Sequence, residues 1–253
     1  MSPSVSPAPL PSSLASHHST GRGQITLRQA DPSNPLRLIA LGDSLVYGFG
    51  DPEGGGWVER LRRRWMMPDT PGHVVYNLGI RGDGVRQVLQ RLEDEFSKRG
   101  ELRHRVPDCI ILSVGTNDSA RVGRPTGRNF TAFDDFENDL GELLSRAQRL
   151  CPVIFVGMTP VDELRMPFAG ILYYTHDDQY RYKEATRLAC EARQIPYLDI
   201  FELWKQRGDR WWQSRLSADG LHPNSAGYAS LFEDFLAWDC GYDWEPGRQM
   251  AVV

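Results

Sequence analysis

The sequence has few cysteines, four in 253 residues: Cys109, Cys151, Cys190 and Cys240. They lie far apart, and no two of them form a Cys-x-x-Cys pair. A chain of this length can bury a sizeable core without covalent cross-links. We therefore expect reduced thiols in a cytoplasmic protein, with neither a disulfide framework nor a zinc site.

Long apolar runs and an excess of positive charge are also lacking. No stretch approaches the ~18 consecutive apolar residues of a membrane span. Residues 1–20 are rich in serine and proline, without the basic start and apolar block of a secretory signal. The formal net charge of −4 gives no global attraction to nucleic acid or to an anionic membrane. We expect no nucleic-acid partner and no stable membrane anchoring.

Composition divides the chain into three parts. Residues 1–35 combine prolines with serines and glycines, and they bury too little apolar surface to offset the entropy of ordering, so a flexible tail is predicted. Residues 36–240 carry the regular patterns of one folded domain. Residues 241–253 form a C-terminal extension whose role the sequence does not define. Overall, 40% hydrophobic and 25% charged residues are typical of a globular protein.

Short apolar runs alternate with amphipathic stretches along this domain. Continuous apolar runs are typical of strands buried on both faces, and here they cover residues 36–41, 74–78, 109–114, 153–157 and 195–200. Three stripes with helical spacing predict helices between or after them: Val85, Val88, Leu89, Leu92 and Phe96; Phe133, Phe136, Leu140, Leu143, Leu144 and Ala147; and Ala229, Phe232, Phe235 and Leu236. This alternation predicts a doubly wound α/β fold, with the ligand site beyond the carboxyl ends of parallel strands.

Glycine-rich and polar segments follow the predicted strands. Gly42-Asp43-Ser44-Leu45 comes after the first strand, residues 77–83 after the second, and Gly115-Thr116-Asn117-Asp118 after the third, while Asp219-Gly220-Leu221-His222 lies beyond the fifth. Each segment alone is common in turns. Together, at one edge of a sheet, they supply what acyl transfer needs: a hydroxyl nucleophile, a base, a carboxylate to orient the base, and donors for an oxyanion.

These four segments, in this order, resemble the sequence blocks of the SGNH (GDSL-type) hydrolases. The resemblance implies a flavodoxin-like three-layer α/β/α sandwich with a five-stranded parallel sheet. It implies that Ser44 is the nucleophile, that His222 is the general base, and that Asp219 orients this base. The backbone N–H groups of Ser44 and Gly82 and the side-chain amide of Asn117 would form the oxyanion hole. It implies no cofactor and no metal.

The function that follows is a serine hydrolase that cleaves a small-molecule carboxylic ester or thioester through an acyl-enzyme on Ser44. Among lysophospholipids, acyl thioesters and acetylated sugars the sequence does not choose, because specificity lies in variable loops. The alternative is a catalytically inactive ligand-binding module on the same fold. A third interpretation is a flavin- or nucleotide-binding protein. Oligomeric state is not indicated.

Further residues carry less specific signals. Phe168 and Trp212 are hypothesised to line an acyl pocket, and ordinary packing over the sheet edge is the equally favoured alternative. Asp83 is expected to cap the helix that follows it. His176, Asp177 and Asp178 are interpreted as the start of a helix rather than as metal ligands.

Overall fold

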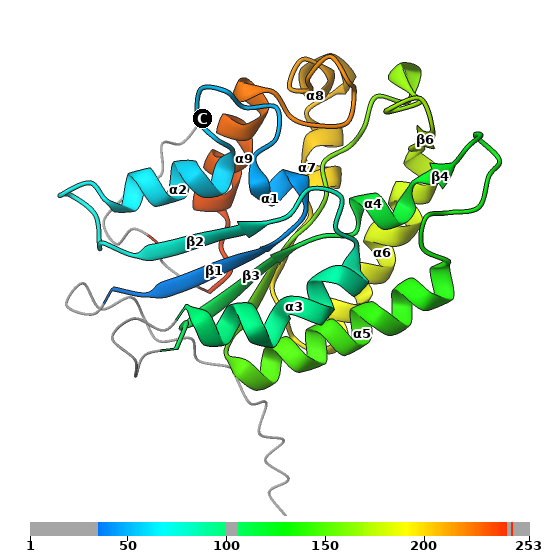
Figure 1. The fold of residues 1–253 in the computed structure, drawn as a ribbon. Helices are drawn as coiled ribbons and strands as arrows, with labels where there is room; N and C mark the ends of the chain where they lie inside the picture. The colour runs from blue at the N-terminus through cyan, green and yellow to red at the C-terminus, as the bar shows by residue number, and fades with distance from the viewer. Residues whose placement is uncertain (1–34, 100–105, 242–243, 245–253) are drawn as a thin grey trace, which may run out of the picture.

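The computed structural model describes residues 35–99, 106–241 and 244 (Figure 1). The predicted flexible tail, apart from its last residue, lies outside the described residues. The predicted C-terminal extension does too, apart from Gly241 and Trp244. The indole of Trp244 stacks on the ring of Phe235 with ring centroids 5.4 Å apart, so this residue packs against the domain.

Five strands form one parallel sheet in the order β2-β1-β3-β5-β7, which confirms the predicted fold class. Their bounds are β1 (Arg37–Gly42), β2 (Val74–Gly79), β3 (Cys109–Ser113), β5 (Val153–Val156) and β7 (Tyr197–Leu198). The last strand is shorter than the predicted 195–200. The chain turns into a helix at Ile200, because the Asp199 side chain accepts the backbone N–H of Glu202 and caps that helix.

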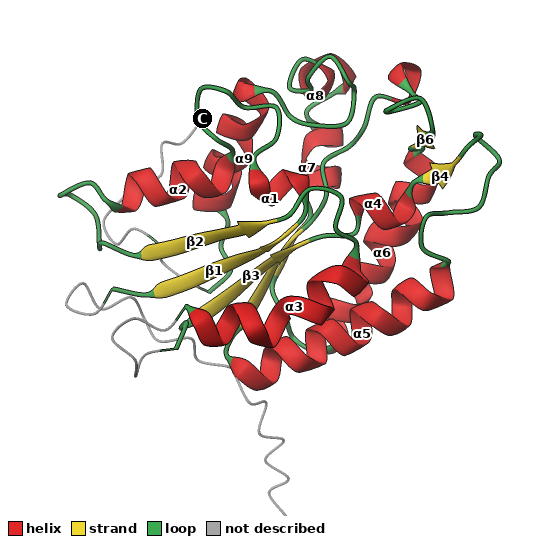
Figure 2. Cartoon of the chain, in the orientation of Figure 1, coloured by secondary structure: helices red, strands yellow, loops and turns green. Residues whose placement is uncertain are grey.

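Helices cover both faces of the sheet (Figure 2). One layer contains α1 (Ser44–Tyr47), α2 (Trp57–Trp65), α7 (Ile200–Gln206), α8 (Asp209–Gln213) and α9 (Ser225–Ala237), and the other contains α3 (Val85–Lys98), α5 (Phe133–Leu150) and α6 (His176–Ala192). Strand β1 is buried between the layers. Leu38 and Ala40 join the core with α2, α7 and α9, whereas Ile39 and Leu41 join the core with α3, α5 and α6. This alternation follows from the period of two along a strand.

The buried face of α9 differs from the predicted stripe. Of the four residues expected to face the core, Phe235 is fully buried; the fully buried apolar residues with it are Tyr228 and Leu231. The hydroxyl of Tyr228 donates a hydrogen bond to the carbonyl oxygen of Phe49, 2.9 Å away. Phe232 and Leu236 of the predicted stripe are partly buried and pack against the same core, so the buried face of α9 is wider than the stripe and includes a tyrosine with a polar partner.

A second, two-stranded antiparallel sheet lies beyond the main sheet and was not predicted. It pairs β4 (Arg121–Val122) with β6 (Leu172–Tyr173). Strands of two residues are too short to produce a sequence period. The short helix α4 (Thr116–Ser119) leads into β4, and the 3-10 helix η2 (Glu163–Arg165) precedes β6.

In the part of the chain that the structure describes, we find no helix that is both long enough and apolar enough to span a bilayer.

Candidate active site

Ser44 lies at the carboxyl edge of the sheet, directly after β1. Asp43 caps α1 by accepting the backbone N–H of Leu45 at 2.8 Å, and Ser44 is the first residue of that helix. A Cβ on Gly42 would lie 2.0 Å from the carbonyl oxygen of Ser113 on β3. Glycine therefore allows β1 to end against β3 and to hold Ser44 at the centre of the sheet edge.

His222 and Asp219 meet Ser44 from a point 178 residues later in the chain. The Nε2 atom of His222 lies 2.9 Å from Ser44 Oγ, and its Nδ1 atom lies 2.7 Å from Asp219 Oδ2. The other carboxylate oxygen of Asp219 accepts the backbone N–H groups of Leu221 and His222 at 2.9 and 3.0 Å. One short turn thus holds both the carboxylate and the imidazole.

The surroundings of Asp219 keep it ionised. Burial alone would raise the pKa of this carboxyl, but the hydrogen bonds from the His222 side chain and from two backbone N–H groups outweigh burial, so the pKa lies below its usual range. A carboxylate in this state accepts the Nδ1–H of His222 and leaves Nε2 as the acceptor that faces Ser44.

Two phenylalanines flank the imidazole. The ring of Phe49 contacts His222 edge-on with centroids 4.7 Å apart, and the ring of Phe168 does so at 5.5 Å. His222 is 3% exposed as a result. Phe49 was not predicted from the sequence, because its position five residues after Ser44 belongs to no motif.

Gly82 and Asn117 open into the same cavity as Ser44. Gly82 has a φ of +85°, and no atom of its surroundings lies within 4 Å of an added Cβ, so the backbone there is accessible. The Nδ2 atom of Asn117 donates to the carbonyl oxygen of Asp83 at 2.9 Å and, at the longer distance of 3.5 Å, to Asp43 Oδ2. A ligand oxygen could compete for the second, longer bond.

Asp83 does not cap α3 as predicted. Its carboxylate accepts the Nε–H of Arg91 at 2.9 Å. The buried Asp118 supplies the cap instead, because its Oδ2 accepts the backbone N–H of Val85 at 3.1 Å. Asp118 also accepts the Thr131 hydroxyl at 2.7 Å. Asp118 thus connects the start of α3, three residues after Gly82, to α4, the helix that contains Asn117.

The cavity at Ser44 has a volume of about 300 Å³. Phe168 lines it. Trp212 does not line it: the indole is buried in the core on the α2, α7 and α9 side, and its Nε1–H donates to Asp209 at 3.0 Å. The residues around the cavity are Ser44, Arg81, Gly82, Asn117, Phe168, Leu172, Tyr174, Leu221 and His222.

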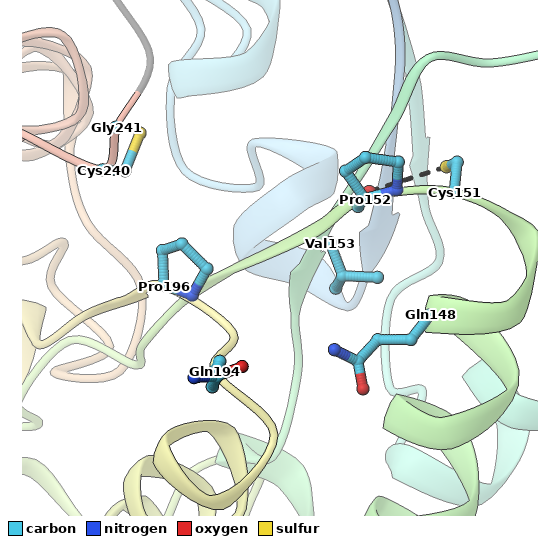
Figure 3. A pocket seen from close by; sticks show the side chains of 8 residues that line it. All are labelled: Gln148, Cys151, Pro152, Val153, Gln194, Pro196, Cys240 and Gly241. Carbon is cyan, nitrogen blue, oxygen red and sulfur yellow. Dashed lines mark hydrogen bonds between the residues drawn. The ribbon is translucent and has the colours of Figure 1, made fainter. Parts of the chain in front are cut away.

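A second hollow of about 340 Å³ lies at the opposite, amino-terminal edge of the sheet (Figure 3). The end of α5, the start of β5 and the loop before β7 contribute to its wall, with Cys151 and Cys240 on different sides. Burial raises the pKa of the Cys151 thiol to about 12, so this thiol is a poor nucleophile. The described residues that line this hollow include no hydroxyl–imidazole pair, in contrast to Ser44 and His222 in the first cavity.

The described residues contain no group of three or more histidine, cysteine or acidic side chains placed to hold a metal ion. His176, Asp177 and Asp178 begin α6, whose N-cap is Thr175, as the sequence predicted. Asp178 forms an ion pair with Arg121, with Oδ1 2.8 Å from Nη2.

A family model for the GDSL-like Lipase/Acylhydrolase family matches residues 40–230. The chain belongs to this family. The match spans the strands and helices that carry Ser44, Gly82, Asn117, Asp219 and His222.

Relatives in this family include GDSL esterase/lipase At5g45920 of Arabidopsis thaliana, with 25% identity over 78% of this chain and 83% of the relative. The protein YpmR of Bacillus subtilis is 22% identical over 84% of each chain. Among solved structures, a lipase/acylhydrolase from Enterococcus faecalis superposes with a TM-score of 0.62, at 20% identity, over 79% of this chain and 93% of the other. A catalytic mutant of Axe2, an acetylxylan esterase from Geobacillus stearothermophilus, gives a TM-score of 0.64, at 20% identity, over 84% and 97%. The two solved structures share the fold of this chain.

Asp43 is the buried carboxyl closest in sequence to Ser44, and it is 1% exposed. Burial raises its pKa to about 7, and the charges of Asp118 and Asp83 act in the same direction, against the lowering effect of the Leu45 N–H. The folded protein therefore binds a proton at Asp43 that the unfolded chain releases near pH 4.

We predict that replacing Asp43 with asparagine changes the pH dependence of stability. Because the pKa is raised on folding, the wild type loses stability relative to Asp43→Asn as pH rises from about 4 to about 7, and the difference is constant above that range. The steepest slope of this difference is about 1.4 kcal/mol per pH unit. Urea unfolding of both proteins between pH 4 and 8 measures it, and parallel curves would contradict the assignment.

Proposed function

We propose that this member of the GDSL family is a serine esterase that cleaves carboxylic esters or thioesters through an acyl-enzyme on Ser44. The observation that carries the proposal is the continuous contact from Ser44 Oγ through His222 to Asp219, at 2.9 and 2.7 Å, on the wall of a cavity. This is the arrangement in which an imidazole can activate a hydroxyl.

In the first half of the reaction, Ser44 Oγ bonds to the carbonyl carbon while His222 Nε2 takes the hydroxyl proton. Asp219 holds the Nδ1–H and stabilises the imidazolium that forms. The tetrahedral intermediate then breaks the bond to the alcohol or thiol, which receives the proton from His222. In the second half, His222 activates a water molecule that attacks the acyl-enzyme, and Ser44 regains its proton as the acid leaves.

The negative oxygen of the intermediate needs donors placed before the reaction begins. The proposed donors are the N–H groups of Ser44 and Gly82 and the Nδ2–H of Asn117, which all border the cavity. The accessible backbone at Gly82 supports the assignment of its N–H as one of these donors. The Tyr174 hydroxyl donates to Asn117 Oδ1 at 3.3 Å and orients the amide.

The cavity favours a short acyl group. Its volume of about 300 Å³ is at the lower end for small-molecule sites, and Phe168, Leu172 and Leu221 give it apolar walls. The solved acetylxylan esterase Axe2, which has the same fold, supports an acetyl or similarly small group. The inactive binding module is disfavoured because each of the five catalytic positions carries the side chain or backbone that the mechanism requires.

We predict that Ser44→Ala and Asn117→Ala reduce hydrolysis of p-nitrophenyl acetate to different extents. Ser44→Ala loses the nucleophile and falls by about 10³-fold or more. Asn117→Ala loses one oxyanion donor and falls by about 10²–10³-fold in kcat. Initial rates measure both, with the exposed Ser97→Ala on α3 as the control. The proposal would be contradicted if Ser44→Ala were as active as the wild type. It would also be contradicted if the wild type hydrolysed no member of a panel of ester chain lengths and acyl thioesters.

We predict that kcat/KM falls on acidification below neutral pH. A protonated imidazole cannot accept the Ser44 proton, and Asp219, with its lowered pKa, stays ionised through this range and adds no inflection. Asp43, with a pKa of about 7, also titrates in this range, so the fall should persist in Asp43→Asn. Rates on a neutral ester between pH 5 and 8 test this. A flat profile would argue against His222 as the base.

A further inference from the structure

Arg81 borders the proposed catalytic cavity from the residue before Gly82. Its side chain is exposed, yet it has a defined position, because the guanidinium carbon lies 3.7 Å from the centroid of the Phe49 ring. Such stacking on an aromatic face leaves the N–H edge of the guanidinium free to meet a ligand.

The positive charge of Arg81 is not taken up by an acid within the described part of the chain, where no carboxylate forms an ion pair with it. The acids close to the reacting groups have other partners, and Asp43 accepts the backbone N–H of Leu45. Asp83 pairs with Arg91 at 2.9 Å, and Asp219 pairs with His222 at 2.7 Å. Apart from the imidazole of His222, the other cavity-lining side chains are neutral. The cavity therefore presents one fixed cation beside uncharged walls.

The aromatic contacts place this cation close to the proposed base. Phe49 connects Arg81 to His222, with the rings of Phe49 and His222 4.7 Å apart. In the proposed mechanism the leaving oxygen or sulfur must lie at His222 Nε2 to receive its proton. The apolar residues Leu172 and Phe168 come from the β6 segment, which also supplies the Tyr174 contact to Asn117. The acyl group would lie at Leu172 and Tyr174, next to the proposed oxyanion donor Asn117, and the alcohol part would lie toward Phe49 and Arg81.

We propose that Arg81 binds an anionic group, a carboxylate or a phosphate, in the alcohol part of the ester. The inference rests on the proposed esterase function and deepens it by naming a substrate class. Arginine suits planar or multi-oxygen anions because two of its N–H groups can donate in parallel. A negatively charged alcohol distinguishes this substrate class from the esters of neutral sugars.

The test compares 4-acetoxybenzoate with its neutral methyl ester. Both release a phenol from an acetyl group, and they differ in one negative charge remote from the bond that breaks. We expect Arg81→Gln to lose about tenfold more kcat/KM on the anionic ester than on the neutral one, and Arg81→Lys to lose less. Arg149→Gln, exposed at the end of α5 and at the opposite edge of the sheet, is the matched control and should behave as the wild type. Added salt should reduce the difference between the two esters.

Direct binding provides a second readout that does not depend on turnover. In the Ser44→Ala background, calorimetry should detect 4-hydroxybenzoate, the anionic product, binding more tightly than its methyl ester, and Arg81→Gln should remove this preference. The inference is overturned if Arg81→Gln affects both esters equally and leaves product binding unchanged. It is also overturned if the Arg81-dependent preference appears for phenyl hydrogen succinate, whose charge is in the acyl part, and not for 4-acetoxybenzoate.

These results separate the inference from the function on which it rests. If the wild type hydrolyses the neutral ester without any effect of Arg81 on charge preference, the inference fails and the esterase function stands. If the wild type hydrolyses neither ester, nor any member of the panel of ester chain lengths and acyl thioesters, faster than Ser44→Ala, the esterase function fails.

Discussion

The hydrogen bond between Ser44 and His222 is the interaction on which the site depends, and the fold is arranged to form it. β1 lies between β2 and β3 in the sheet, and Gly42 allows it to end against Ser113. The turn that carries His222 lies near the C-terminal end of the domain sequence. Asp219 stabilises this turn by accepting the backbone N–H groups of Leu221 and His222. Ser44 and His222 are 178 residues apart in the chain, so this contact forms only when the whole domain is folded.

Buried and half-buried carboxyl groups lie close to this contact, and their environments give them different states. Asp219 receives three hydrogen bonds and stays ionised. Asp43 is desolvated and next to other acids, so its pKa rises to about 7. Asp118 joins α4 to the start of α3. The same residue type thus has a proposed role in proton transfer at Asp219 and a structural role at Asp118. The positive charge of Arg81 lies at the cavity mouth, where a substrate can reach it.

Much of the fold and the proposed catalytic residues could be predicted from the sequence, because buried parallel strands are apolar throughout and their carboxyl ends meet at one edge. What could not be predicted depends on distant contacts. The cap of α3 comes from Asp118, about thirty residues away, and β4 and β6 are too short to produce a period. Phe49 and Arg81 belong to no recognisable motif, and their roles follow from the stacking of Arg81 on Phe49, which the sequence does not show. Trp212, by contrast, is near the Asp219 turn in sequence but packs into the core.

Covalent labelling tests the central claim most directly. A fluorophosphonate ester reacts with a serine whose hydroxyl is activated by a base, and mass spectrometry of the digested protein locates the adduct. The account predicts stoichiometric labelling of Ser44 in the wild type and a strong loss of labelling in a folded His222→Ala variant. An unlabelled wild type, or labelling of Ser44 that is as fast without the imidazole, would contradict it.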